Sequence, residues 1–216
     1  MPILRQKIVQ GYREFKERVN ISRYLHLVLI FVRIATKAHY PLEMLQNVAN
    51  PYFVKILLQM LFQVSVDCKL QVLAIFQTLL RIQVPLTIFN EGVQELKAKF
   101  RTESKVVFES SFAQFLYLSA LQIIAGTWDS AFSEEMRGGL YDVSVHLTRS
   151  VALCLKIEAK AKKSQTCNQL SQVCLQISRG ELNELEIFTV MQVMQATCSM
   201  PVIGDMVLFA EKPSAE

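Results

Sequence analysis

The sequence predicts an all-α protein in which antiparallel helices stack against one another, and three observations support this. The 216 residues include only 7 Gly and 6 Pro, so turns are few and the elements between them should be long. Hydrophobic residues make up 51% of the chain, and they recur at the three- and four-residue spacing of helix faces. Helix-start and helix-stop residues separate these periodic segments, and no segment alternates convincingly as a strand does. The expected architecture is a stack of helices or an irregular helical bundle.

The first two helices are expected at Ile3–Val19 and Ile21–Lys37. The first segment is amphipathic, and one of its faces is basic. That face carries Arg5, Lys7, Arg13, Lys16 and Arg18. The second segment is more apolar, so we expect it to be more buried, and it should end before Pro41. A short helical turn is expected at Pro41–Val48.

The next two helices, Phe53–Val64 and Cys68–Ile82, are apolar on nearly every side. The dipeptide Asn50-Pro51 is a start signal for the first of them, and Asp67 is the expected cap of the second. A helix that is apolar all round belongs inside a packed array. The second helix has two apolar faces, formed by Leu73, Phe76 and Leu80 and by Cys68, Ile75 and Ile82. We therefore expect it to be an interior helix with neighbours on both sides.

Five further helices are expected in the rest of the chain. They span Leu86–Lys99, Ser104–Ala125, Leu140–Lys162, Thr166–Ser178 and Glu181–Ser199. Gly126 should break the second of these, and Gly180 should separate the last two, because glycine suits the turn that ends a helix. Residues 97–105 are polar and form the best candidate linker. We expect one helical domain over residues 1–200, with a subdivision near 97–105, followed by a short apolar segment and a polar tail over 201–216.

None of the apolar segments is expected to cross a membrane. A spanning helix needs about 20 mostly apolar residues. The most apolar region is interrupted by Lys55, Asp67, Lys69 and Arg81. The window Ser110–Trp128 is uncharged and long enough, but its Ser, Thr and Gln side chains make it too polar for a helix in contact with lipid.

Residues 42–96 read LEMLQNVANPYFVKILLQMLFQVSVDCKLQVLAIFQTLLRIQVPLTIFNEGVQEL. They contain a short helix, a helix that starts at Pro51, a polar turn with Asp67, and a long apolar helix that ends at Pro85. This order resembles armadillo/HEAT-type helical repeats, although the 34 residues from Pro51 to Pro85 are a little short of the usual repeat. The resemblance implies an α-solenoid segment used for protein–protein contact, and it implies no activity and no particular site residues.

The net charge of +4 is unevenly distributed along the chain. Residues 1–108 carry 15 Lys and Arg against 7 Asp and Glu, whereas residues 109–216 carry 8 against 12. A basic first half suits an acidic protein or an anionic membrane surface, although such cations also serve simply to solvate a helix face. They are scattered and are not interleaved with aromatic residues, which disfavours nucleic acid as a partner.

The cysteines indicate a reducing compartment. The chain has five of them, with no CxxC pair and no Cys/His cluster at zinc spacing. The N-terminal sequence MPILRQKIVQGYREFKERV has no apolar signal region, so we expect free thiols in a cytoplasmic protein. This sequence is amphipathic and contains Arg, as mitochondrial presequences do, but Glu14 and Glu17 weigh against that interpretation.

We expect no enzyme activity, no cofactor and no metal. The chain has no G-x-S-x-G, Walker A, G-x-G-x-x-G or H-E-x-x-H pattern. Asp142 and His146 are four residues apart, which places a carboxylate beside an imidazole on one helix face. A nucleophile at Ser150 or Cys154 would also need an oxyanion site, which the sequence does not supply. We therefore interpret the two residues as an ordinary helix-surface pair.

The predicted function is that of a non-catalytic scaffold or adaptor that binds other proteins, either by itself or as a segment of a larger helical-repeat protein. The candidate partner-binding residues are Met191 and Met194 in the methionine-rich C-terminal part, and Arg5, Arg13 and Lys16 on the basic face. Methionine side chains adapt well to apolar partners, but they also fill protein cores. The alternative function is attachment to a membrane surface through the basic face of the first helix.

Overall fold

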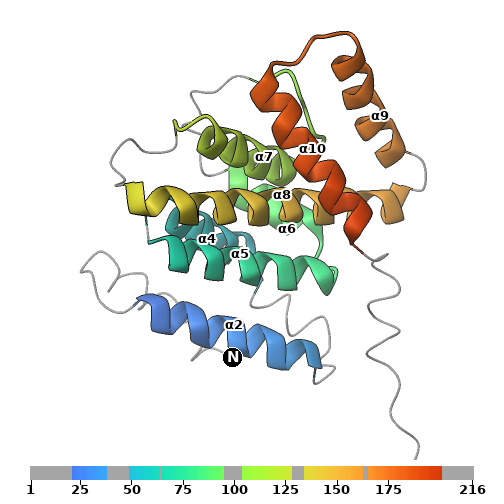
Figure 1. Cartoon of the computed structure of the whole chain (residues 1–216). Helices are drawn as coiled ribbons and strands as arrows, with labels where there is room; N and C mark the ends of the chain where they lie inside the picture. Colours follow the sequence, from blue (N-terminus) through green and yellow to red (C-terminus); the bar gives the residue numbers. More distant parts are fainter. Residues whose placement is uncertain are drawn as a thin grey trace, which may run out of the picture. The chain divides into compact units, whose positions relative to one another are not determined.

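The computed structural model is all-α, as the sequence predicts (Figure 1). It describes residues 21–37, 49–63, 65–94, 104–127, 134–162 and 165–200, and these contain eight helices and no strand. The chain divides into two compact units, Met1–Ala98 and Lys99–Glu216. The described helices of the first unit are α2 (Ile21–Lys37), α4 (Pro51–Gln63), α5 (Val66–Arg81) and α6 (Leu86–Gln94), and those of the second are α7 (Ser111–Ile124), α8 (Glu134–Lys162), α9 (Gln165–Ser178) and α10 (Glu184–Ser199).

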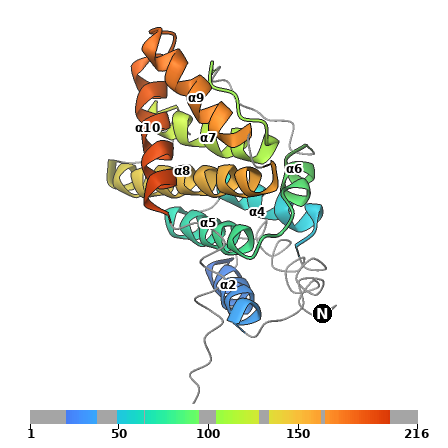
Figure 2. The ribbon, with the colours of Figure 1, turned by 90° about the vertical axis from the view of Figure 1, so that its right-hand side faces the viewer.

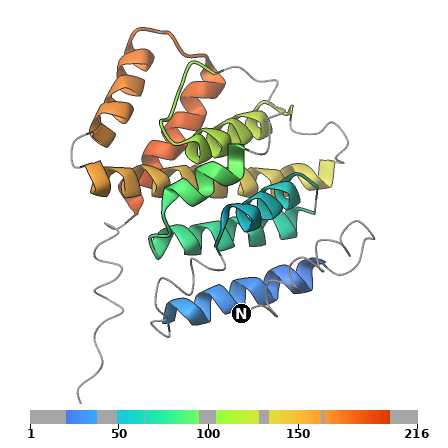
Figure 3. The ribbon, with the colours of Figure 1, turned by 180° about the vertical axis from the view of Figure 1, so that it is seen from behind.

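Helix α5 has neighbours on more than one side within the first unit. It packs against α2 and against α4, which lie on different sides of it (Figures 2 and 3). Leu73, Phe76 and Leu80 of one face are buried, and so are Cys68 and Ile75 of the other, whereas the predicted Ile82 follows the helix and is half-buried. The prediction of an interior helix with two apolar faces is therefore confirmed.

Helix α4 begins where the sequence predicts. Asn50 Oδ1 accepts a hydrogen bond from the backbone N–H of Phe53 at 2.9 Å, and Pro51 takes the first helical position, where a missing N–H leaves no donor unpaired. Near the other end, the ammonium group of Lys69 on α5 donates to the carbonyl oxygen of Leu61 at 2.7 Å, although Lys69 is fully buried. A cation is favourable there because the last carbonyls of a helix lack partners within the helix. Lys69 thus ties α5 to α4.

Gly92 brings α6 into close contact with α4. A methyl group at Gly92 would lie 2.6 Å from Val54 Cγ1 and 3.1 Å from the carbonyl oxygen of Pro51, both of which are too close. Gly92→Ala should therefore lower the free energy of unfolding by about 1–3 kcal/mol. This is the opposite of the usual effect in a helix, where alanine is more favourable than glycine by about 1 kcal/mol. Chemical denaturation of the variant and the parent measures the change.

A double variant tests whether the contact with Val54 is the cause. Val54→Ala removes the 2.6 Å contact with Cγ1 but keeps Val54 Cβ, which would lie 2.8 Å from the new methyl group. Val54→Ala/Gly92→Ala therefore relieves part of the overlap, so the double variant should be more stable than the sum of the two single effects requires. If Gly92→Ala unfolds at higher denaturant than the parent, the helices are not in the close contact described.

The start of α5 differs from the prediction. The helix begins at Val66 with Ser65 as its N-cap residue, and Asp67 lies in the first turn instead of capping the helix. The carboxylate still stabilises this end, because the first turn carries the positive end of the helix dipole. At the other end, Gln83 takes the left-handed conformation (φ 59°) shortly before Pro85.

In the second unit, α7 lies beside α8, and α10 packs against both of them (Figure 1). Helix α8 also contacts α9, which precedes α10 in the chain. Phe112 and Tyr117 of α7 and Leu155 of α8 are completely buried and belong to the core of this unit. Gly126 (φ 68°) follows α7 and Gly180 (φ 67°) follows α9, which confirms the predicted breaks.

Helix α7 begins at Ser111, whereas the prediction placed its start near Ser104. The intervening residues are not helical, and their burial alternates: Val106 and Phe108 are buried, and the side chain between them is exposed. Ser110 ends this segment because its side chain caps the helix and accepts a hydrogen bond from the backbone N–H three residues later at 3.3 Å. The alternating segment 104–110 is therefore separate from the helix that follows it, and the predicted start near Ser104 was wrong.

Other helix starts also differ from the prediction, and the two largest differences are those of α8 and α10. Helix α8 begins at Glu134, before the predicted Leu140, and α10 begins at Glu184, after the predicted Glu181. Several expected features lie outside the described residues. They are the helix at Ile3–Val19, the turn at Pro41–Val48, and the apolar segment and tail over 201–216.

Within the part of the chain that the structure describes, none of the helices combines the length and apolarity that crossing a bilayer needs. Helix α7 covers most of the uncharged window Ser110–Trp128 but is only 14 residues long. Its Ser119 side chain is buried and donates a hydrogen bond to the carbonyl oxygen of Phe115 at 2.8 Å. The described part of this window therefore belongs to a protein core, where the Ser119 hydroxyl is satisfied.

Candidate protein-interaction surface

Helix α10 places three large apolar side chains on the side that faces solvent. Leu185, Phe188 and Met191 are each between 43% and 54% exposed. Glu184 and Gln195 lie on the same side and are exposed as well. These five residues form the α10 outer face, which has no cation because the helix contains neither Lys nor Arg. Apolar side chains grouped in this way mark contact sites, unlike apolar residues scattered singly over a surface.

Glu186, on the buried side of α10, fixes the N-terminal end of the helix. Its backbone N–H donates to Asn183 Oδ1 at 2.9 Å, and its carboxylate accepts from the Asn183 N–H at 3.2 Å, which completes a capping box. The same carboxylate accepts from Ser104 Oγ at 2.7 Å and from the Lys105 N–H at 2.8 Å. Glu186 therefore joins α10 to the start of the 104–110 segment.

The buried Tyr117 of α7 lies near Glu186 and packs against the 104–110 segment. Burial raises the pKa of Tyr117, and the negative charge of Glu186 raises it too, whereas the contact with Ser104 lowers it. The Tyr117 ring packs edge-on against Phe108, with ring centroids 5.2 Å apart. The phenol stays neutral at physiological pH, so no second negative charge develops beside Glu186.

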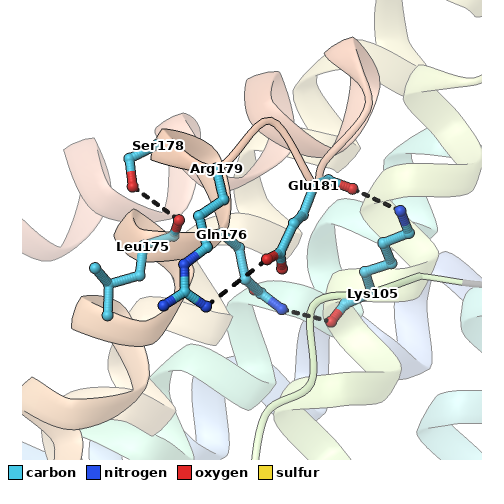
Figure 4. A network of polar contacts seen from close by, with 6 residues as sticks. All are labelled: Lys105, Leu175, Gln176, Ser178, Arg179 and Glu181. Carbon is cyan, nitrogen blue, oxygen red and sulfur yellow. Dashed lines mark hydrogen bonds and ion pairs between the residues drawn. The ribbon is translucent and has the colours of Figure 1, made fainter.

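The turn between α9 and α10 is held by a network of polar contacts (Figure 4). Lys105 Nζ donates to the carbonyl oxygen of Glu181 at 2.8 Å, and Gln176 Nε2 donates to the carbonyl oxygen of Lys105 at 3.2 Å. Lys105 is therefore bound both to the last part of α9 and to the turn itself. Arg179 and Glu181 also form an ion pair at 3.8 Å, which contributes little because both side chains are well exposed to water.

The C-terminal end of α10 is held by α8. The ammonium group of Lys156 donates a hydrogen bond to the carbonyl oxygen of Met200, so a cation lies at the carbonyl end of α10. Burial lowers the pKa of Lys156, and the neighbouring Cys198 acts in the opposite direction. Both ends of α10 are thus fixed to other parts of the second unit, and the α10 outer face is presented in one orientation.

Helix α2 carries a second exposed apolar stripe. Leu27, Ile30 and Ile34 are between 39% and 58% exposed, and Arg23 and Arg33 beside them are exposed as well. These five residues form the α2 outer face, and α2 contains no Asp or Glu. The expectation of a more buried helix holds for one side of α2 only. The residues buried on that side are Leu25, Val28, Leu29 and Val32.

The structure describes two of the five predicted binding residues. Met191 lies in the middle of the α10 outer face, and Met194 is half-buried at its edge. Arg5, Arg13 and Lys16 lie outside the described residues. Whether any of these residues binds a partner stays a prediction.

Leu185 and the whole α2 outer face were not among the predicted binding residues. A signal for α2 was present, because Leu27, Ile30 and Ile34 recur at helical spacing on a helix that has Arg residues and no acid. This spacing alone did not identify an exposed face, because α2 has apolar residues on several sides and the sequence does not show which side packs on the core.

The Asp142–His146 pair on α8 is not arranged around a reactive nucleophile. Ser150 Oγ donates a hydrogen bond to the backbone carbonyl oxygen of His146 at 2.9 Å, as serines inside helices commonly do. Cys154 is completely buried, and this burial raises the pKa of its thiol, which therefore stays protonated and weakly nucleophilic. These contacts agree with the interpretation of the pair as a feature of the helix surface.

His146 should make stability depend on pH. Burial lowers the pKa of His146, Arg149 lowers it too, and Asp142 partly opposes them. The unfolded chain, in which the pKa is about 6.5, then binds more protons than the folded protein below that pH. Stability should therefore fall as the pH drops from about 7 toward about 5. Denaturant titrations at several pH values should show a smaller fall for His146→Gln, and an equal fall in both proteins would contradict this role of His146.

A comparison of the chain with protein-family models, with curated proteins and with solved structures found no match. Among the described residues, no group of three or more His, Cys, Asp or Glu is placed to hold a metal ion. The fold and the surface define a class: an all-α protein that exposes apolar faces on two of its helices.

Proposed function

We propose that this protein is a non-catalytic protein–protein interaction module, a scaffold or adaptor built as a short α-solenoid of the armadillo/HEAT kind. The observation that carries the proposal is the α10 outer face. Leu185, Phe188 and Met191 are exposed side by side on a helix that is held at both ends. Covering apolar surface is favourable by about 25 cal/mol per Å², and a helix that is already fixed loses little conformational freedom when a partner binds it.

The packing of the first unit supports the solenoid part of the proposal. Helix α5 contacts α2 and α4, and α4 contacts α6. The helices therefore form a series, α2, α5, α4 and α6, in which each packs against the next. An α-solenoid is built in this way and offers an extended surface to its partners. The free thiols of Cys68 and Cys154 support a reducing compartment, which for a protein of this class is the cytoplasm.

Photo-crosslinking in cells tests the proposal. Benzoylphenylalanine is placed at Phe188 or at Met191, and the matched control carries it at Tyr141 of α8, an apolar residue with 53% exposure. We expect a discrete protein adduct from both α10 positions and only background from Tyr141. The adduct from position 188 should disappear when Leu185→Glu is added, because a carboxylate beside the contact opposes burial.

The contradicting results are equally specific. Crosslinking at background level from both α10 positions would show that the α10 outer face has no partner in the cell. The same products from Tyr141 as from Phe188 would show that the adducts reflect random collisions.

The alternative, attachment to a membrane surface, is supported by the α2 outer face, since Leu27, Ile30 and Ile34 lie beside Arg23 and Arg33. Flotation with vesicles that contain anionic lipid tests this alternative. Salt-sensitive flotation that Arg23→Glu/Arg33→Glu abolishes would support it. Absence of flotation at low salt would contradict membrane attachment and would favour a protein as the partner of the α2 outer face.

A further inference from the structure

We infer that the α10 outer face of one copy of this protein binds the α2 outer face of a second copy. The inference rests on the proposed function, because it names the partner of the same surface. Two features of the described helices carry it: their charges are complementary, and their exposed side chains have the same spacing.

The two faces carry opposite charge. Arg23 and Arg33 flank the apolar residues of α2, and the helix contains no acid. Glu184 begins the α10 outer face, and that helix contains no base. An antiparallel contact between two α2 faces would bring Arg23 of one copy near Arg33 of the other, and a contact between two α10 faces would give Glu184 no cation as a partner. Charge therefore favours the mixed contact over either symmetric one.

The two faces also match in spacing. The α2 outer face follows positions 23, 27, 30 and 34, and the α10 outer face follows positions 184, 188, 191 and 195. Each set has intervals of four, three and four residues, which places its members in one stripe along a helix. The apolar positions are the two in the middle of each stripe, together with Ile34 on α2. The two stripes can therefore face each other over the same length.

The helix dipoles select the antiparallel arrangement. In that arrangement Arg33 lies next to Glu184 at the positive end of α10, and the C-terminal end of α2 lies there too. Arg23 then lies at the carbonyl end of α10, where a cation is favourable. The apolar pairs are Ile30 with Phe188 and Leu27 with Met191. In the parallel arrangement like ends of the two helix dipoles would lie side by side.

Each copy offers both faces, so the contact is head-to-tail. Such a contact uses different patches on the two partners, and repeating it gives a ring if the rotation closes or a growing chain if it does not. The contact of two helix faces is small for a protein interface, so we expect it to form at on the order of 100 µM protein.

Two face variants test the inference by sedimentation equilibrium of the full chain. One is Leu27→Glu/Ile34→Glu on α2, and the other is Phe188→Glu/Met191→Glu on α10. The parent should grow in mass with concentration beyond a dimer, whereas each variant alone should stay monomeric. An equimolar mixture of the two variants should form a dimer and nothing larger, because each variant supplies the face that the other lacks. Circular dichroism confirms that both variants keep the parent's helix content.

A charge exchange tests the orientation. Arg33→Glu and Glu184→Lys should each weaken association of the parent about two- to fivefold, the usual effect of an exposed ion pair, and the combination should restore it. Arg23→Glu combined with Glu184→Lys should not restore it. Restoration by Arg23→Glu instead of Arg33→Glu would overturn the antiparallel arrangement.

Other results overturn the inference itself. A parent that stays monomeric up to about 500 µM excludes association in the range expected for a small interface. Loss of association in only one of the two variants means that identical faces pair. A parent that stays monomeric but floats with anionic vesicles through Arg23 and Arg33 assigns the α2 outer face to lipid. A monomeric parent that still gives a crosslink to another protein from Phe188 overturns this inference and leaves the proposed function standing.

Discussion

Phe76→Ala should lower the free energy of unfolding by about 3–5 kcal/mol, the usual result of removing a buried aromatic ring. The Phe76 side chain is completely buried in α5. Its ring meets that of Phe89 edge-on, with ring centroids 6.2 Å apart, so the truncation also removes an aromatic contact between α5 and α6. A typical domain is stable by only about 5–15 kcal/mol, so the loss is large enough to detect as a much lower melting temperature.

Phe188→Ala is the matched control, because it makes the same chemical change on the α10 outer face. Phe188 is 46% exposed, so its removal leaves no closed cavity and should cost about 1 kcal/mol or less. Thermal melting of both variants beside the parent makes the comparison. Equal melting of Phe76→Ala and the parent would mean that α5 is not an interior helix.

Glu186→Ala should be the second most damaging substitution, at about 2–4 kcal/mol. The buried carboxylate accepts hydrogen bonds from Ser104 Oγ and from the Lys105 N–H, and it closes the capping box with Asn183. Alanine leaves these donors without their acceptor, and a buried donor that loses its partner costs about 1–3 kcal/mol. Denaturant unfolding measures the change in stability.

Glu184→Ala is the control for this experiment. Glu184 lies in the same first turn of α10 but is exposed, so its loss should cost only the interaction with the helix dipole, about 0.3–1 kcal/mol. Hydrogen exchange adds a local readout, since the Lys105 amide should exchange faster in Glu186→Ala and not in Glu184→Ala. If the two variants lose equal stability, the carboxylate of Glu186 does not hold the 104–110 segment.

The parts of the fold that the sequence predicted well depend on local signals. Asn50 and Pro51 mark the start of α4 because a cap and a first-turn proline act within a few residues of each other. Gly126 and Gly180 mark turns because their left-handed backbone strongly favours glycine. The burial of both faces of α5 was also predictable, because its apolar residues surround the helix.

The parts that the sequence did not predict depend on residues far apart in the chain. Glu186 reads as a solvated acid in the first turn of a helix, and only the fold brings Ser104 and Lys105 to it. Likewise, Lys69 reads as an interruption of an apolar run until α4 places the carbonyl oxygen of Leu61 within 2.7 Å of its ammonium group. For the candidate surface, the sequence indicated Met191 because methionine is common at adaptable contacts, but it could not separate the outer face of α10 from the inner one.

The buried ammonium group of Lys69 has a consequence for the chemistry of this chain in solution. An amine-reactive label needs a free and accessible nitrogen, and that of Lys69 is enclosed and bonded to Leu61. The ammonium group of Lys105 is also hydrogen-bonded, to the carbonyl oxygen of Glu181, but it lies at the surface and should be acylated faster than Lys69 in the native protein. The acylation rate of Lys69 in the native protein would then report how often α4 and α5 separate locally.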